Sequence, residues 1–196
     1  MKNDNRGFTL TELIVSIAIF AIVAAAAYGF MVAGAQSYTG VSDKLSRQLR
    51  AQMAFSQIEN RLIDCDTAVY ATGSKLYIVN KNSTDGTKYD VCVYELKDTD
   101  HILYFGKLEE QTLALSSGKL NASSLTSLTG LTATEVLAKK VASFSAAVPD
   151  TGKTTVDGVA RARSIQVTLV LQTRTGANGA TDTQTVALRN SPQLLS

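Results

Sequence analysis

The feature that most constrains this chain is a long interval without charge near its N-terminus. After Glu12 the next charged residue is Asp43, and the apolar part of the interval, residues 13–35, reads LIVSIAIFAIVAAAAYGFMVAGA. As a helix this part would be about 35 Å long, enough to cross the hydrocarbon core of a bilayer. Lys2 and Arg6 precede it, so the positive-inside rule places the N-terminus in the cytoplasm and the rest of the chain outside.

Three kinds of N-terminal segment fit this pattern. An ordinary secretory signal peptide would end at an A-x-A site within Ala24–Ala27, and a permanent anchor would stay uncleaved. The third kind accounts for more of the residues, because Arg6-Gly7 stands just before the apolar run and one carboxylate, Glu12, stands inside its start. A charge at the centre of a bilayer costs about 2.5–3.5 kcal/mol on insertion scales and less near the edge, so a lone acid there calls for a partner.

The block Gly7-Phe8-Thr9-Leu10-Thr11-Glu12-Leu13 closely resembles the class III signal of type IV prepilins and type II secretion pseudopilins. The resemblance implies that a prepilin peptidase cuts between Gly7 and Phe8 and that Phe8 becomes N-methylated. It also implies that Glu12 pairs with the N-terminal amine of a neighbouring subunit, and a buried carboxylate beside an ammonium costs far less than either group alone. Many pilins carry a proline that kinks this helix, whereas Gly29 stands in that region here.

A second apolar pattern continues the helix beyond the apolar segment. Apolar side chains recur at steps of mostly four and five residues between polar ones, at Leu45, Leu49, Met53, Ile58 and Leu62. This spacing predicts an amphipathic helix. Because no proline interrupts residues 8–64, we expect one long helix over residues 9–63, the second half of which packs against a head.

From Cys65 onward the sequence is typical of β-strands. The strands that we expect are Thr67–Thr72 and Lys75–Asn80 as a hairpin, Tyr89–Leu96, His101–Phe105, Ala142–Val148, and Ser164–Thr173 with Thr183–Leu188 as a second hairpin. Residues 106–133 look like an extended loop region. The fold class is therefore α+β, and a long N-terminal helix packed on an antiparallel sheet is the type IV pilin fold.

The resemblance to type IV prepilins divides the chain into three parts. They are a cytoplasmic leader over residues 1–7, a transmembrane or filament-core helix over 8–40, and an extracellular part with the amphipathic helix and a β-rich head over 41–196. The prepilin is then a single-pass cytoplasmic membrane protein, and the mature chain belongs to an extracellular or periplasmic filament.

A weaker resemblance concerns the head. Val136–Phe144, Arg163–Leu169 and Thr185–Asn190 are similar to segments of J-type pseudopilins and W-type minor pilins. This implies a minor subunit of a type IV pilus, competence or type II secretion filament that initiates assembly or caps the tip. The implied partners are the prepilin peptidase, other minor pilin subunits contacted through the N-terminal helix, the assembly platform and the membrane. The alternatives are a major pilin and an exported domain on an ordinary signal anchor.

The chain has two cysteines, Cys65 and Cys92, and both lie in the part expected to be exported. The even number and the compartment favour a disulfide between them, which would tie the end of the helix to a central strand. Closing a loop of this size is worth roughly 3.5 kcal/mol in the chain-entropy model. The alternative is two buried free thiols.

No residue pattern indicates catalysis or a bound cofactor. His101 follows Asp98 and Asp100, but a lone histidine beside acids is more often a surface residue than a metal ligand. The loop Asn80–Gly86 resembles a calcium loop only loosely, because alternate acids and the distal glutamate are missing. Phosphate-binding and nucleophile motifs are missing as well, so we expect neither an enzyme nor a metal site.

The charge of the chain does not favour a nucleic-acid partner. The formal net charge is +2, whereas nucleic-acid binding needs a basic patch or stripe. Arg161, Arg163 and Arg174 would form such a patch only if the fold gathered them, and a solvated face is the alternative.

Overall fold

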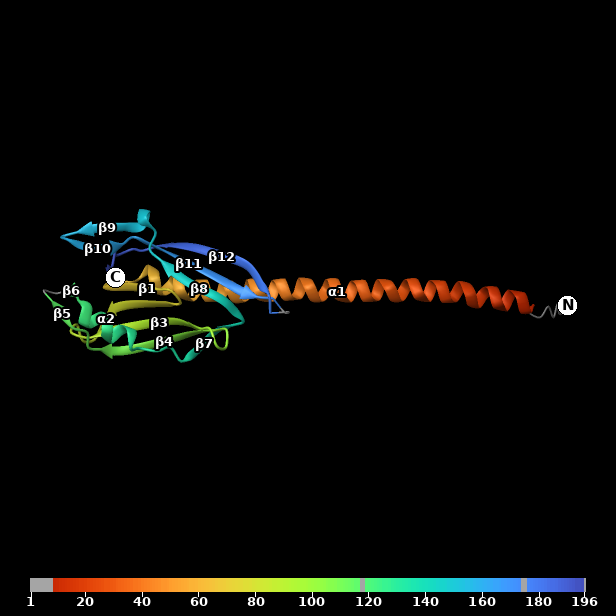
Figure 1. Cartoon of the computed structure of the whole chain (residues 1–196), viewed down its shortest axis with the longest axis horizontal. Helices are drawn as coiled ribbons and strands as arrows, with labels where there is room; N and C mark the ends of the chain where they lie inside the picture. The colour runs from red at the N-terminus through yellow and green to blue at the C-terminus, as the bar shows by residue number, and fades with distance from the viewer. Residues whose placement is uncertain (1–8, 117–118, 174–175, 196) are drawn as a thin grey trace. The chain divides into compact units, whose positions relative to one another are not determined.

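The computed structural model describes residues 9–116, 119–173 and 176–195. The chain divides into two compact units, residues 1–45 and 46–196, and helix α1 (Leu10–Ile63) contributes to both (Figure 1). The helix predicted over residues 9–63 is thus confirmed to within one residue at its start. Its length follows from the sequence, since no proline removes a backbone hydrogen bond over this range.

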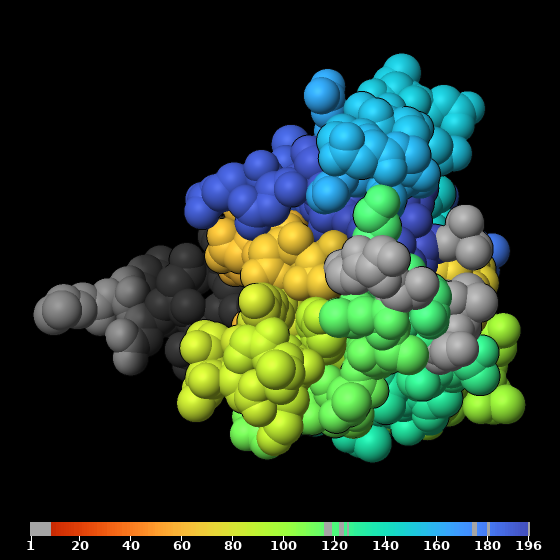
Figure 2. Space-filling view, turned by 90° about the vertical axis from the view of Figure 1, so that its left-hand side faces the viewer, coloured from red at the N-terminus to blue at the C-terminus, as the bar shows by residue number. Residues whose placement is uncertain are grey.

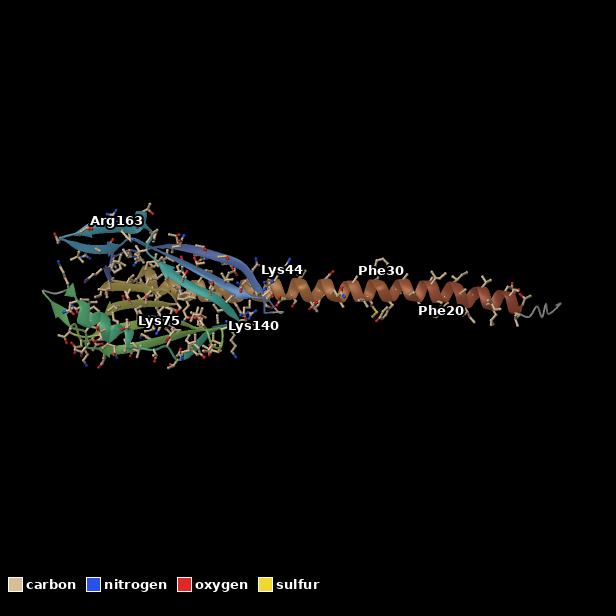
Figure 3. All side chains as sticks on the ribbon, viewed as in Figure 1. Phe20, Phe30, Lys44, Lys75, Lys140 and Arg163 are labelled. Carbon is tan, nitrogen blue, oxygen red and sulfur yellow. The ribbon has the colours of Figure 1, made fainter. Side chains whose placement is uncertain are left out.

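The first unit consists, in its described part, of the N-terminal portion of α1. Its large apolar side chains are 37–82% exposed, and in Figure 3 they stand out on both sides of the helix, Phe20 and Phe30 among them. A helix that is apolar on every face is stable only inside a membrane or among other helices. Within the part of the chain that the structure describes, α1 is the one helix long and apolar enough to cross a membrane.

The second unit contains the end of α1 and two main sheets. The larger sheet has eight strands in the order β7-β4-β3-β2-β1-β13-β10-β9. Their bounds are β1 (Ala68–Thr72), β2 (Lys75–Lys81), β3 (Tyr89–Lys97), β4 (Ile102–Gln111), β7 (Glu135–Lys139), β9 (Lys153–Val156), β10 (Val159–Ala162) and β13 (Gln193–Leu195). The smaller sheet has three strands in the order β12-β11-β8, which are β8 (Val141–Ala147), β11 (Ser164–Gln172) and β12 (Asn178–Ala187). All pairings in these sheets are antiparallel except that of β1 with β13.

Both faces of the larger sheet are covered. Leu76 and Ile78 of β2 belong to a core shared with α1 and the three-stranded sheet, whereas Tyr77 and Val79 face a second core. Figure 1 shows β11 and β12 on one side of the end of α1, and β3 and β4 on the other. A strand that is buried on both faces reads as a continuous apolar run, as in the central residues of β2. Side chains of β3 alternate between the two cores, since Val91 lies in one core and Cys92 in the other.

The face of α1 that packs in the second unit agrees only in part with the expected one. The buried residues of α1 are Ala51, Ala54, Phe55, Ile58 and Leu62. Leu45, Leu49 and Met53, which the sequence pattern placed on the same stripe, are 50–63% exposed. The prediction is confirmed at Ile58 and Leu62 and wrong at these three positions, because the buried stripe runs through Ala51, Ala54 and Phe55 instead.

The segment expected to be an extended loop, residues 106–133, is largely structured. It holds the end of β4, the short pair β5 (Leu115–Ser116) and β6 (Lys119–Leu120), and helix α2 (Ala122–Thr129). A reciprocal capping box begins α2, since the Asn121 side chain accepts from the Ser124 backbone N–H and the Ser124 hydroxyl accepts from the Asn121 N–H. Leu128 of α2 is fully buried in the second core, so this segment covers the outer face of the large sheet.

The two predicted hairpins are confirmed, with β1 pairing with β2 and β11 with β12. Strands β7, β9, β10 and β13 were not predicted. They are five residues long or shorter, so local alternation gives little signal for them. Strands β7 and β13 pair with strands distant in sequence, whereas β9 and β10 form a hairpin of their own across Asp157 and Gly158.

Candidate functional site at the start of helix α1

Thr9 and Glu12 form a capping box at the start of α1. The Glu12 Oε2 atom accepts hydrogen bonds from the Thr9 backbone N–H at 3.0 Å and from the Thr9 hydroxyl at 2.9 Å. The Glu12 N–H in turn donates to Thr9 Oγ1 at 3.3 Å, and the Leu13 N–H donates to the Thr9 carbonyl at 3.2 Å. These bonds satisfy amide groups that would otherwise lack partners at the first turn of a helix.

The second oxygen of the Glu12 carboxylate, Oε1, makes no hydrogen bond within the described residues. The carboxylate is the single charge on α1 before Asp43. Its side chain is thus held in place by Thr9 through one oxygen while the other oxygen is free to accept from another molecule. Chemically, this arrangement can bind a cation or a strong donor such as an ammonium group.

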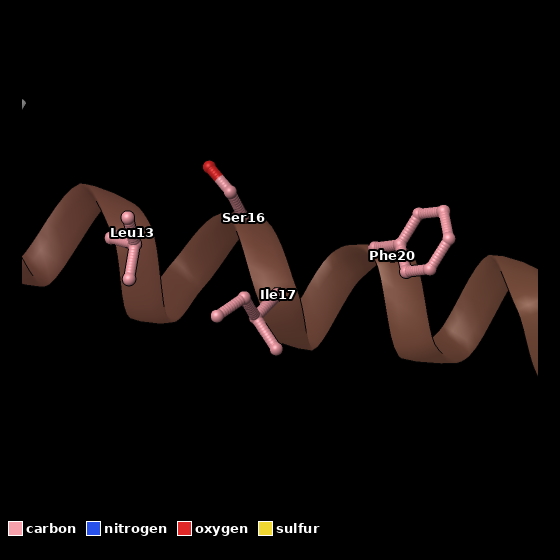
Figure 4. A pocket seen from close by; sticks show the side chains of 4 residues that line it. All are labelled: Leu13, Ser16, Ile17 and Phe20. Carbon is pink, nitrogen blue, oxygen red and sulfur yellow. The ribbon is translucent and has the colours of Figure 1, made fainter.

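One face of the helix next to Glu12 carries a shallow groove. It is lined by Leu13, Ser16, Ile17 and Phe20, which follow each other at the three- and four-residue steps of one helix face (Figure 4). The apolar side chains of this groove are 54–74% exposed. Ridges of a second helix fit grooves of this kind, so this face is suited to packing against another helix.

The other predicted site residues are those of the cleavage site and the two cysteines. Gly7 and Phe8, the expected cleavage site, lie outside the described residues. Cys65 and Cys92 are free, buried thiols in the structure, and the disulfide between them stays a prediction for the oxidised protein. Cys65 Sγ donates to the Ala68 and Val79 carbonyls at 3.4 and 3.7 Å. Burial raises the pKa of Cys65 to about 12 and also raises the pKa of Cys92.

The polar residues considered for metal binding are engaged in turns. Asp100 accepts from the Ile102 N–H at 3.2 Å and from the Tyr104 hydroxyl at 2.7 Å, and His101 is exposed with a positive φ of 55°. In the other loop, Asp85 accepts from the backbone and hydroxyl of Thr87. The described residues contain no group of three or more histidine, cysteine or acidic side chains placed to hold a metal ion.

Two features of α1 were not predicted from the sequence. One is the capping role of Glu12. The sequence does contain a signal for it, because the pattern Thr9-x-x-Glu12 before an apolar run is typical of a helix start. The exposure of Leu49 and Met53 had no comparable signal, because apolar spacing alone does not say which of two stripes a head covers.

Comparison with known families supports the interpretation of the N-terminus. Residues 2–28 match the family described as the prokaryotic N-terminal methylation motif. No curated protein and no solved structure shows a significant match to the chain. The matched segment contains the Thr9–Glu12 capping box and most of the apolar part of α1.

The motif and the fold together define a class. A methylation motif, a long apolar N-terminal helix and an antiparallel-rich head give the α+β architecture of type IV pilin-like proteins. The motif implies processing by a prepilin peptidase and assembly into membrane-associated pilus structures, and the helix is suited to anchoring in a membrane. Proteins with this motif are structural rather than enzymatic.

Proposed function

We propose that this chain is a prepilin that is processed between Gly7 and Phe8 and then built into a filament as a minor subunit. The leader stays in the cytoplasm during insertion, residues 8–40 cross the membrane, and the head lies outside. After cleavage, Phe8 carries the new N-terminal amine and becomes N-methylated. The filament belongs to a type IV pilus, competence or type II secretion system.

The observation that carries this proposal is the placement of Glu12. Its carboxylate is the lone charge within the first 33 residues of α1, and its Oε1 has no partner among the described residues. An unpaired carboxylate in an apolar layer is costly, and a cation brought by a second molecule removes the cost. The amine of a neighbouring subunit is such a cation, so Glu12 sets the axial position of one helix against the next.

Apolar surface on α1 supports packing among helices. The groove along Leu13, Ile17 and Phe20 lies in the segment that leaves the membrane on assembly, and Leu49 and Met53 add exposed apolar side chains further along the same helix. These surfaces would be buried by other subunits of the filament. The limited similarity of the tail to J-type pseudopilins and W-type minor pilins favours a minor over a major subunit.

Mass spectrometry of the mature N-terminus tests the processing step. The expected result is a chain that begins with N-methylated Phe8. An N-terminus near Tyr28 would show an ordinary signal peptide and overturn the proposal, and an uncleaved chain would show a plain anchor. The abundance of the chain in sheared filaments separates the minor from the major subunit, since a minor subunit is present in small amounts.

Two substitutions at one position separate the charge of Glu12 from its capping role. Glu12→Gln keeps a side-chain acceptor for Thr9 but removes the charge, and Glu12→Val removes both. We expect cleavage to continue in both variants and incorporation into filaments to fall strongly in both. Thr9→Val, which removes the hydroxyl and keeps the charge, is the matched control and should be incorporated much better. Normal incorporation of Glu12→Gln would rule out pairing with an amine.

A further inference from the structure

A groove of about 410 Å³ lies in the second unit, where the ends of several strands meet. Its walls come from the segment between α1 and β1, the end of β2, the β5–β6 hairpin, β10 and β13. The Gln193 side chain of β13 holds this hairpin, since it accepts from the Leu120 N–H at 3.2 Å and donates to the Leu120 carbonyl at 3.0 Å. Figure 2 faces this end of the unit, with the β9–β10 segment in light blue and the segment around β6 in green.

The groove is positively charged. It is lined by Lys81, Lys119 and Arg161 against one carboxylate, Asp66. That carboxylate is already used within the fold, because its Oδ1 accepts from the Lys81 backbone N–H at 3.0 Å and from the Thr67 hydroxyl at 2.7 Å. The excess of positive charge in this one groove equals the formal net charge of the whole chain, +2.

The three cations lack anionic partners among the described residues. Lys119 Nζ donates to the Asp157 carbonyl at 3.3 Å, and Arg161 Nη1 donates to the Ser191 carbonyl at 3.1 Å. The Nε atom of Arg161 is buried and has no hydrogen-bond partner within the described part of the chain. The guanidinium, which is half-buried as a whole, thus keeps donor capacity that no acceptor among these residues uses.

Several other lysines of the same unit, in contrast, are paired with acids. Ion pairs join Lys75 to Glu95 at 2.8 Å, Lys88 to Glu110 at 2.7 Å and Lys153 to Asp150 at 2.9 Å. Of the apolar residues at the groove, Leu120 and Val159 are buried and Leu115 is exposed. A ligand that complements this surface therefore carries carboxylates above all.

We propose that this groove binds an acidic peptide segment of a partner protein, with Arg161, Lys119 and Lys81 as the residues that bind its carboxylates. A single-stranded nucleic acid would instead need cations that follow its backbone and exposed aromatic rings for base stacking. The aromatic residue in the groove, Tyr89, is 7% exposed and offers no such platform. All groove residues belong to the second unit, so the inference does not depend on the filament role proposed above.

Fluorescence anisotropy of the full chain in a neutral detergent tests this inference. The probe is a fluorescein-labelled peptide of alternating glutamate and alanine, and its matched control has glutamine in place of glutamate. We expect the acidic peptide to bind, the glutamine peptide not to bind, and binding to weaken as salt is raised. Arg161→Gln should weaken binding about tenfold, because a charge-assisted hydrogen bond is lost.

Variants of the lysines keep the test valid if Arg161→Gln disturbs folding. Lys81→Gln and Lys119→Gln replace exposed side chains, so thermal unfolding should be unchanged and binding should still weaken several-fold. Lys153→Gln, outside the groove, is the control and should bind like the unmodified protein. The proposal is overturned by no binding, by an equal loss in Lys153→Gln, or by binding of single-stranded DNA as tight as that of the acidic peptide.

Discussion

Replacing Ile58 by alanine tests which face of α1 packs in the second unit. Ile58 is 1% exposed and lies in the core shared by α1 and both sheets. The change removes three carbon atoms, worth about 2.4 kcal/mol at about 0.8 kcal/mol each, and leaves a cavity that adds a further cost. We expect the free energy of unfolding to fall by about 3–4 kcal/mol.

Met53→Ala is the matched control, because Met53 lies on the same helix but is 63% exposed. It should change the free energy of unfolding by less than about 0.5 kcal/mol. The assay is urea unfolding of the full chain in a neutral detergent, followed by the circular dichroism of the β-strands. Equal losses in the two variants, or a larger loss in Met53→Ala, would refute the assignment of the packed face.

Three further predictions concern buried groups of the second unit. Glu95 is 8% exposed and pairs with Lys75. Lys75→Met would leave this buried carboxylate without its partner, so it should lower the free energy of unfolding by about 2 kcal/mol. The control Lys153→Met, beside the exposed Asp150, should have no measurable effect in the same assay. In the reduced protein the pKa of Cys65 is raised to about 12, so the folded state keeps the thiol proton that an unfolded thiol loses near pH 9. Stability should therefore fall more between pH 9 and 12 in the unmodified protein than in Cys65→Ala, and equal slopes would contradict this. In the oxidised protein, mass spectrometry after unfolding and alkylation without reduction should find neither Cys65 nor Cys92 labelled, and label on both would exclude the disulfide.

The long helix could be predicted from the sequence, but its packed face only in part, at Ile58 and Leu62. A charge-free run followed by apolar spacing without proline leaves a helix as the one consistent structure over residues 10–63. The choice of face depends on Ala51 and Ala54, which carry little weight in a hydrophobic pattern and yet are almost fully buried. The burial of these two alanines is a property of the assembled core, so local apolar spacing does not reveal it.

The central strands were predictable for a similar reason. The runs in β2, β3 and β11 are rich in β-branched and aromatic residues, which favour strands. Helix α2 was hidden by a sequence rich in serine and threonine, and its formation rests on the Asn121 capping box and the burial of Leu128. The capping box is a local hydrogen-bond pattern and the burial of Leu128 is tertiary packing, so hydrophobic periodicity indicates neither.

The two sites differ in how much of each could be predicted. Glu12 stands out because a single acid in an apolar run is costly, and its helix-start pattern with Thr9 lies within four residues. The cationic groove draws on Lys81, Lys119 and Arg161, which are far apart in the chain. Among the arginines considered at the outset, Arg161 lines this groove, Arg163 is exposed and Arg174 lies outside the described residues.

The position of β13 has a consequence for the order in which the head is completed. Gln193 pairs with Ala68, 125 residues earlier in the chain, and β13 lies between β1 and β10 in the large sheet. Until residues 193–195 have been synthesised, the strands from β7 to β1 and the β9–β10 pair are two separate pieces with open edges. The sheet therefore closes late, and its last strand is the one that joins the start of the head to its end.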